Sequence, residues 1–244
     1  MARIFPLDGQ ASAGLWWYSL LLYDLDDEGN CSLTPAQLSP PGLSGRGYLA
    51  SQFGAPCEDG AAVASCTQAF SESAPPLPMA TETSKTGRST DIRLHHVAPV
   101  LPGGWVLLGE QTKFVAVSPQ RFVAARVSAS AMAATGASDA LAEDELLRSP
   151  DGGGLFEFTV LGEPGESVGV AVVVPSGNAG GGGGSGGGNA SAKDNAAGMM
   201  GDGMGVVAVV KVVVGASGRS EVECAAKPAG CRVLHAGARG SGAL

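Results

Sequence analysis

The chain has 244 residues, of which 44% are hydrophobic and 16% are charged, against about 25% charged residues in an ordinary globular domain. Its 15 basic and 23 acidic side chains give a formal net charge of −8, and its Lys and Arg residues are scattered singly. Nucleic acids and anionic membranes bind clusters of basic side chains, so the sequence argues against both partners. The apolar residues are largely Ala and Val, which predicts a modest core with long Gly- and Ala-rich loops.

The first apolar segment, residues 15–23, is rich in aromatic side chains. Its composition and length favour a buried strand over a helix. A membrane helix needs about 20 apolar residues, so no membrane span is predicted. A signal peptide is the alternative interpretation, but acidic residues follow the segment where a small-residue cleavage site should stand.

Those acidic residues form a turn at 24–30, with acids at relative positions 1, 3 and 5 and a glycine at position 6. This pattern resembles a calcium-binding loop. However, position 12 of such a loop should be a bidentate Glu and is Pro35 here. We therefore expect a solvated turn, with calcium binding as the alternative.

Residues 91–128 contain the best-formed β pattern. Strands are predicted at 91–100, 105–108, 113–118 and 121–128. Turns containing Pro, Gly or Ser separate most of them, and a shorter strand is predicted earlier, near Tyr48. Strands of this length and spacing indicate an antiparallel meander.

Two further strands, 155–161 and 167–174, flank a Gly-Glu-Pro-Gly turn. This arrangement predicts a β-hairpin. Before them, an Ala-rich segment contains a predicted short helix over 138–147, with Ser138 as its N-terminal cap.

Residues 176–205 are so rich in glycine that ordering them would cost more entropy than packing returns. We expect a disordered insertion between two strands of one sheet, with a domain linker as the alternative. Strands predicted at 206–214, 219–224 and 231–234 follow, and three strands are too few to be stable alone. The chain, residues 1–244, is therefore predicted to be one all-β domain, an antiparallel β-sandwich with at most one short helix.

Four of the five cysteines form two close pairs, Cys57 with Cys66 and Cys224 with Cys231. Neither pair has the CxxC spacing of a zinc or redox site, and each could close a small disulfide loop. Glycosylation sequons at residues 30–32 and 189–191 also suit a secretory route. Free buried thiols in a reducing compartment are the alternative, so cytoplasmic and secretory locations remain equally open.

The sequence predicts no catalytic residue, cofactor or metal site. His95 and His96 lie next to each other in a predicted strand, so they point to opposite faces and cannot share one metal. We expect one to be buried and hydrogen-bonded and the other to be exposed. Trp16, Trp17 and Trp105 are candidates for stacking on a sugar ring, although at least one of the adjacent pair Trp16 and Trp17 should belong to the core.

One stretch resembles a known family. The residues H-V-A-P-V at 96–100, followed by L-P-G-G-W at 101–105 and the segment 106–122, are similar to the C-terminal β-domain of the raffinose synthase and seed-imbibition group of α-galactosidase-like proteins. The strands within 155–174 and 206–214 are similar to later strands of that domain.

In that family the activity resides in a preceding (β/α)₈ barrel that bears two Asp residues, and nothing in this sequence matches the barrel, which needs about 250 residues. The resemblance implies a fragment: a non-catalytic accessory β-domain of a carbohydrate-active enzyme of the α-galactosidase or galactosyltransferase-like kind. Its partner would be carbohydrate or a missing catalytic domain. The alternative is a free-standing secreted binding or structural β-module.

Overall fold

The fold is known from a computed structural model, which describes a part of the chain. The described residues are 2–3, 16–22, 32–35, 47–71, 74, 77–78, 93–128, 154–176, 205–226 and 229–234. Within them the chain is all-β, its strand pairs are antiparallel, and the one α-helix is the single turn α1 (Val63–Cys66). The predicted all-β, sandwich-like class is therefore confirmed. The calcium-like turn, the predicted helix, the two sequons and almost all of the Gly-rich tract lie outside the described residues.

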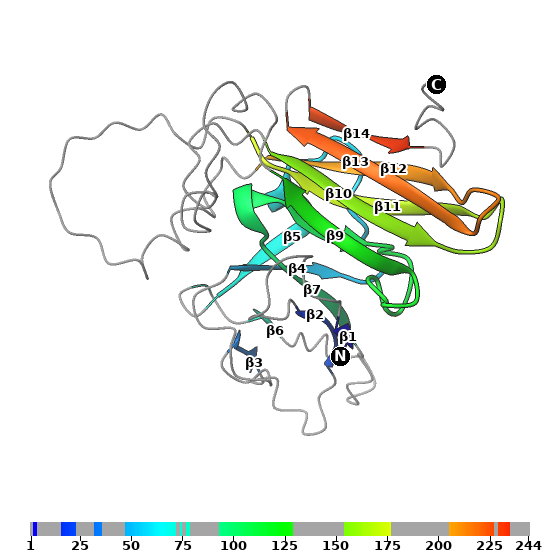
Figure 1. The fold of residues 1–244 in the computed structure, drawn as a ribbon. Coiled ribbons are helices and arrows are strands. Elements are labelled where there is room, and N and C mark those ends of the chain that lie inside the picture. Colours follow the sequence, from blue (N-terminus) through cyan, green and yellow to red (C-terminus); the bar gives the residue numbers. More distant parts are fainter. Residues whose placement is uncertain are drawn as a thin grey trace, which may run out of the picture.

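Most of the described strands belong to three larger sheets (Figure 1). The N-terminal sheet has the order β1 (Ala2–Arg3), β2 (Trp16–Leu22), β7 (Arg93–Pro99), β4 (Tyr48–Gln52) and β5 (Thr67–Phe70). The four-stranded sheet has the order β14 (Ala229–Leu234), β13 (Arg219–Ala226), β10 (Leu155–Leu161) and β9 (Phe122–Ser128). The three-stranded sheet has the order β12 (Val206–Val213), β11 (Ser167–Val174) and β8 (Val106–Gly109). A small ribbon pairs β3 (Ser32–Leu33) with β6 (Leu77–Pro78).

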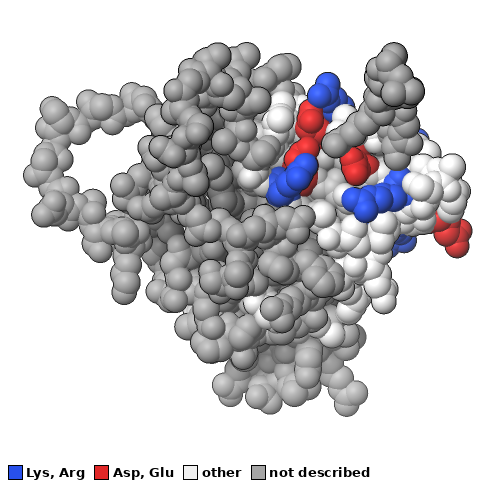
Figure 2. Space-filling view, viewed as in Figure 1, with Lys and Arg blue, Asp and Glu red and all other residues white. Residues whose placement is uncertain are grey.

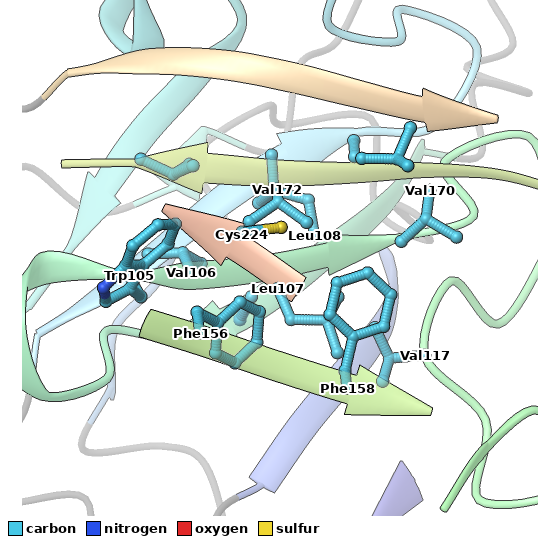
Figure 3. Close-up of a cluster of buried hydrophobic side chains, with 14 of the residues drawn as sticks. Trp105, Val106, Leu107, Leu108, Val117, Phe156, Phe158, Val170, Val172 and Cys224 are labelled. Carbon is cyan, nitrogen blue, oxygen red and sulfur yellow. The ribbon is translucent and has the colours of Figure 1, made fainter. Parts of the chain in front are cut away.

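The main core contains apolar side chains from all three sheets (Figure 3). Trp105, which precedes β8, is fully buried and stacks on Phe156 of β10 with 5.6 Å between ring centroids. Phe158 of β10 and Val172 of β11 are buried in the same cluster. The inward-facing residues of the four- and three-stranded sheets thus form a sandwich core.

The strands after the Gly-rich tract complete both of these sheets. β12 pairs with β11 from Val206 opposite Val174 to Val213 opposite Ser167. β13 pairs with β10 from Arg219 opposite Leu161 to Ala225 opposite Leu155. The C-terminal segment therefore contributes strands to two sheets of the sandwich.

The predicted hairpin at 155–174 is wrong. β10 pairs with β9 and β13, and β11 pairs with β8 and β12, so the two strands belong to different sheets. The turn between them is a corner from one sheet to the other, and the β12–β13 turn forms a second corner beside it. Hydrogen bonds join the corners: Gly162 N donates to Gly218 O at 3.1 Å and Gly165 N to Val214 O at 2.8 Å. A corner lets the apolar faces of β10 and β11 meet across the core, which a hairpin would not allow.

The predicted meander at 91–128 is also wrong, because β7, β8 and β9 lie in three different sheets. The strand predicted at 113–118 is a loop. Glu110 N donates to Ala116 O at 2.8 Å and Lys113 N to Glu110 O at 2.9 Å, so the chain bends back on itself after Gly109. The alternation seen in the sequence reflects which loop side chains are buried, not a pleated strand.

The N-terminal sheet is buried on both faces. Trp17 and Ala98 belong to the main core, whereas their chain neighbours Tyr18 and Val97 belong to a second cluster that includes Leu77 of β6. Successive residues of a strand point to opposite faces, so β2, β4 and β7 each contribute to both clusters.

The structure corrects the expectation that one of the two adjacent histidines is exposed. His95 is 7% exposed and His96 is 4% exposed. β7 lies between β2 and β4 in a sheet with both faces covered, so either direction leads a side chain into the interior.

We predict that Gly109→Ala destabilises the fold by about 2–4 kcal/mol. Gly109 has a φ of +78°, and a Cβ there would collide with the carbonyl of Ala116 and the side chain of Val117. The matched control is Gly169→Ala in β11, where nothing lies within 4 Å of the added methyl group, and its effect should stay within about 0.5 kcal/mol. Urea unfolding of the oxidised protein measures both, and similar losses for the two variants would contradict the account.

Candidate functional site

Two of the three residues proposed to stack on a sugar ring are buried in the structure and cannot do so. Trp105 is 0% exposed, and Trp17 is 4% exposed with its Nε1 donating to Leu107 O at 2.8 Å. Neither indole can present a face to a ligand. Trp16 is partly buried and packs against the second hydrophobic cluster, so the structure does not bring the three indoles together as a platform.

Both predicted cysteine pairs are disulfides in the structure. Cys57 and Cys66 join the two ends of the loop that contains α1, with their Cα atoms 5.2 Å apart. The side chain of Gln111 then ties this loop to the segment after β8, because its Oε1 accepts from Cys57 N at 2.8 Å. Cys224 and Cys231 stand directly opposite each other on β13 and β14 and clip these strands together.

The outer face of the four-stranded sheet has a row of four charged side chains that crosses all four strands, which we call the charged row. It consists of Arg126 on β9, Glu157 on β10, Glu223 on β13 and Arg232 on β14. Each residue stands directly opposite the next in the strand register. Figure 2 shows basic and acidic side chains gathered on this side of the molecule.

The centre of the charged row places two like charges side by side. Glu157 and Glu223 are directly opposite partners on β10 and β13, a position where like charges destabilise a sheet. Each glutamate is balanced by an arginine on its outer side. Arg126 Nε bonds Glu157 Oε2, and Arg232 reaches Glu223 Oε1 with Nη2 at 2.5 Å and Nε at 3.0 Å.

The charged row continues into a wider polar surface. Arg219 Nη2 lies 3.4 Å from Thr159 Oγ1 and 3.6 Å from Glu221 Oε1. With these residues the face has three arginines and three glutamates and no net charge. Such a surface offers donors and acceptors of both signs, which suits another mixed-charge protein surface better than a polyanion.

A further ionic cluster lies at the corner between the two sheets of the sandwich. Arg121 Nε donates to Glu110 Oε1 at 2.9 Å, and its Nη1 and Nη2 donate to the two carboxylate oxygens of Glu166 at 2.7 and 2.6 Å. These hydrogen bonds from Arg121 lower the pKa of the Glu166 carboxyl. Because Arg121 is also bonded to Leu161 O, the cluster acts as a structural clamp.

His96 lies in a buried polar strip of the N-terminal sheet. Ser19 and Ser51 stand opposite it on the two neighbouring strands, and Ser19 Oγ is 3.4 Å from His96 Nδ1. A cavity of about 10 Å³ beside it is lined by His96, Ser19 and Leu108, which is about the space one water needs. Burial lowers the pKa of the His96 imidazole, a backbone hydrogen bond at Lys113 raises it in part, and the nearby His95 lowers it further.

Sequence reasoning missed the charged row. Glu221 and Glu223 alternate with buried residues in one strand, and this pattern predicts an exposed polar face. The sequence does not say that Glu157 faces Glu223, because that depends on which strands pair. In the described part of the chain, no group of three or more His, Cys, Asp or Glu side chains could hold a metal ion.

The fold and these surfaces define a disulfide-linked, all-β, sandwich-like protein with a mixed-charge sheet face. The chain matches no protein-family model, no curated protein sequence and no solved structure. None of the helices among the described residues is long and apolar enough to cross a membrane.

We predict that a double-mutant cycle of Glu157→Gln and Glu223→Gln reports repulsion of about 0.2–1 kcal/mol between the two carboxylates at low salt. The repulsion is lost once, with either substitution, so the double variant should be less stable than the sum of the single effects indicates. Arg126→Gln combined with Glu157→Gln is the control cycle and should report attraction. Unfolding free energies in urea give both coupling energies, and coupling of the same sign in both cycles would contradict the assignment.

We predict that stability falls as the pH drops from about 7.5 to about 5.5, because the unfolded His96 side chain takes up a proton near its ordinary pKa of about 6.5 while the buried one resists it. Stability is thus complete above the unfolded pKa and is lost below it. His96→Gln should have a smaller loss, with His95 unchanged as the internal control. Urea midpoints across this pH range measure the difference, and equal pH slopes would rule out the buried imidazole as its source.

Proposed function

We propose that this chain is an accessory binding module of an oxidising compartment, and that it docks a partner protein or domain through the charged row. The observation that carries the proposal is the pairing of Glu157 with Glu223 across neighbouring strands. Departures from the ordinary rules of sheet stability concentrate at functional positions. The row is also exposed at its ends, where the Arg126 side chain is 57% and the Arg232 side chain 72% accessible.

The two disulfides support the proposed oxidising compartment. Such bonds persist in secreted and extracellular proteins and are rare where glutathione keeps thiols reduced. Cys224 is 0% exposed and Cys57 is 5% exposed, so both bonds belong to the folded core. This supports the secretory location over the cytoplasmic one.

Two kinds of partner fit the proposal. In the first, the partner is the catalytic domain of a carbohydrate-active enzyme in the same polypeptide, as the resemblance to the raffinose synthase group implies. Interfaces between domains of one chain are polar and of moderate size, which suits the charged row. In the second, the module is free-standing and binds a separate secreted protein. Direct sugar stacking is less well supported because Trp17 and Trp105 are buried.

A photo-cross-linking residue at position 219, on the polar face, should capture the partner in the cells that make this protein. Arg219 has half of its side chain exposed. The same residue at the exposed position of Leu21, on β2 of the N-terminal sheet, is the control and should capture nothing. Combining the probe with Arg126→Gln and Arg232→Gln should reduce the cross-linked product by about tenfold or more, because the two terminal charges of the row are lost.

The product also tells the two partners apart. A cross-link within one polypeptide much larger than 24.2 kDa would identify the partner as another domain of the same enzyme. A cross-link to a different polypeptide would identify the chain as a free-standing module. Equal capture at positions 219 and 21 would refute docking through the charged row. Mass mapping without reduction should recover the Cys57–Cys66 and Cys224–Cys231 peptides, and free thiols at all four positions would refute the oxidising compartment.

A further inference from the structure

β12 is an edge strand of the three-stranded sheet, and half of its free edge is already covered. On its inner side it pairs with β11 over its full length. On its outer side, Val207 N donates to Ala61 O at 2.9 Å and Val207 O accepts from Gly60 N at 2.8 Å. Val209 N then donates to the carboxylate of Asp59 at 2.8 Å. The loop at 59–61 therefore protects the first half of the strand.

The second half of the same edge is open. Backbone groups alternate along a strand, so Lys211 and Val213 direct their N–H and C=O groups outward as Val207 does. Among the described residues, one further hydrogen bond reaches this outer edge: Ser220 Oγ donates to Val213 O at 3.0 Å. The outward backbone groups of Lys211 remain available for another strand. Val209 and Val213 are 39% and 47% exposed beside them.

A groove runs along this edge between β12 and β14. Its volume is about 500 Å³, within the range of pockets that hold ligands. The residues that line it include Val209 and Lys211 of β12, Cys231 and Val233 of β14, and Asp59. An open backbone edge beside a groove of mixed polarity is a geometry that accepts an extended peptide as an added strand.

The charged side chains that line the groove indicate which kind of ligand it favours. Asp59 and Lys211 are its two charged lining residues. The Asp59 carboxylate is engaged by Val209 N, which leaves the Lys211 ammonium as the charge available to a ligand. A second copy of this chain is a poor occupant. Antiparallel pairing of two β12 strands about a two-fold axis at Lys211 would place the two lysines opposite each other, and a lysine on an edge strand opposes such pairing.

We propose that the open half of β12 binds an extended acidic segment of a partner protein by strand addition. In the antiparallel register, a Glu or Asp of the segment stands opposite Lys211, and an apolar residue two positions before it stands opposite Val213. Val209 N is occupied by the Asp59 carboxylate, so the segment reads apolar-x-acid and ends its pairing at Lys211. This site uses the backbone edge of β12, whereas the charged row lies on the outer face of the four-stranded sheet, and it does not depend on that row's function.

Fluorescence anisotropy with labelled synthetic peptides and the full-length oxidised protein tests the site. The probe is a short capped peptide with the centre Val-Thr-Glu-Thr-Val, and the control peptide has Lys in place of Glu. The Glu peptide should bind at least about tenfold more tightly, the effect of one charge-assisted pair. Lys211→Glu should reverse the preference. Equal binding of both peptides, or no saturable binding up to millimolar protein, would overturn the proposal.

Val213→Pro separates strand addition from simple charge attraction. It removes one outward N–H at an edge position, where proline is tolerated, and it should abolish binding of the Glu peptide while near-ultraviolet circular dichroism stays unchanged. Binding that survives this substitution would overturn strand addition. Two further results would replace the proposed occupant: a wild-type dimer in sedimentation that Val213→Pro dissociates, or binding of the Glu peptide only after residues 235–244 are deleted.

Discussion

The guanidinium of Arg121 is the contact on which the sandwich depends. It stands at the start of β9 in one sheet and bonds Glu110 and Glu166, which follow β8 and precede β11 in the other. Glu110 is 8% exposed, so without its partner it would be a nearly buried charge, which is far more costly than a surface charge. A Cβ at position 162 would collide with Arg121 Nη1 and Glu166 Oε2, so a larger residue there would displace this ion pair. Two sheet corners and one buried charge therefore require one another.

From this corner the two sheets present different surfaces. The four-stranded sheet has a polar outer face whose charges are already paired with one another, so the partner that we propose would gain affinity there by exchanging or extending those pairs. The three-stranded sheet ends in an edge whose backbone is half covered by the 59–61 loop. In the strand addition that we propose, this edge would recognise the backbone of an extended chain and rely on Lys211 for selectivity. The proposed face and edge sites would thus be complementary modes of recognition.

Sequence patterns located most of the described strands, because alternation reports a local property: which side of a strand is buried. They failed on connectivity. The turn after Leu161 contains the Pro and Gly of a hairpin turn. It is nevertheless a corner, and a hydrogen bond from Arg121, 40 residues away, to Leu161 O holds it. The segment after Gly109 alternates like a strand, but the contact of its carbonyl at Ala116 with Glu110 N makes it a loop. The sequence did not predict the charged row for the same reason. Each charged residue is visible in the sequence, but the strand register that aligns the four side chains is not.

The pairing of β10 with β13 and of β11 with β12 also limits when, during synthesis of the chain, the sandwich can form. Both internal strands, β10 and β11, are synthesised well before the partners that complete their sheets. Residues 206–226 supply these partners, so the sandwich can close only after these residues have been synthesised. Until then the nascent chain has two apolar strands with unpaired edges, which is the state in which β proteins associate with the wrong neighbour. Strands β12 and β13 therefore act as a commitment step in the folding of the sandwich.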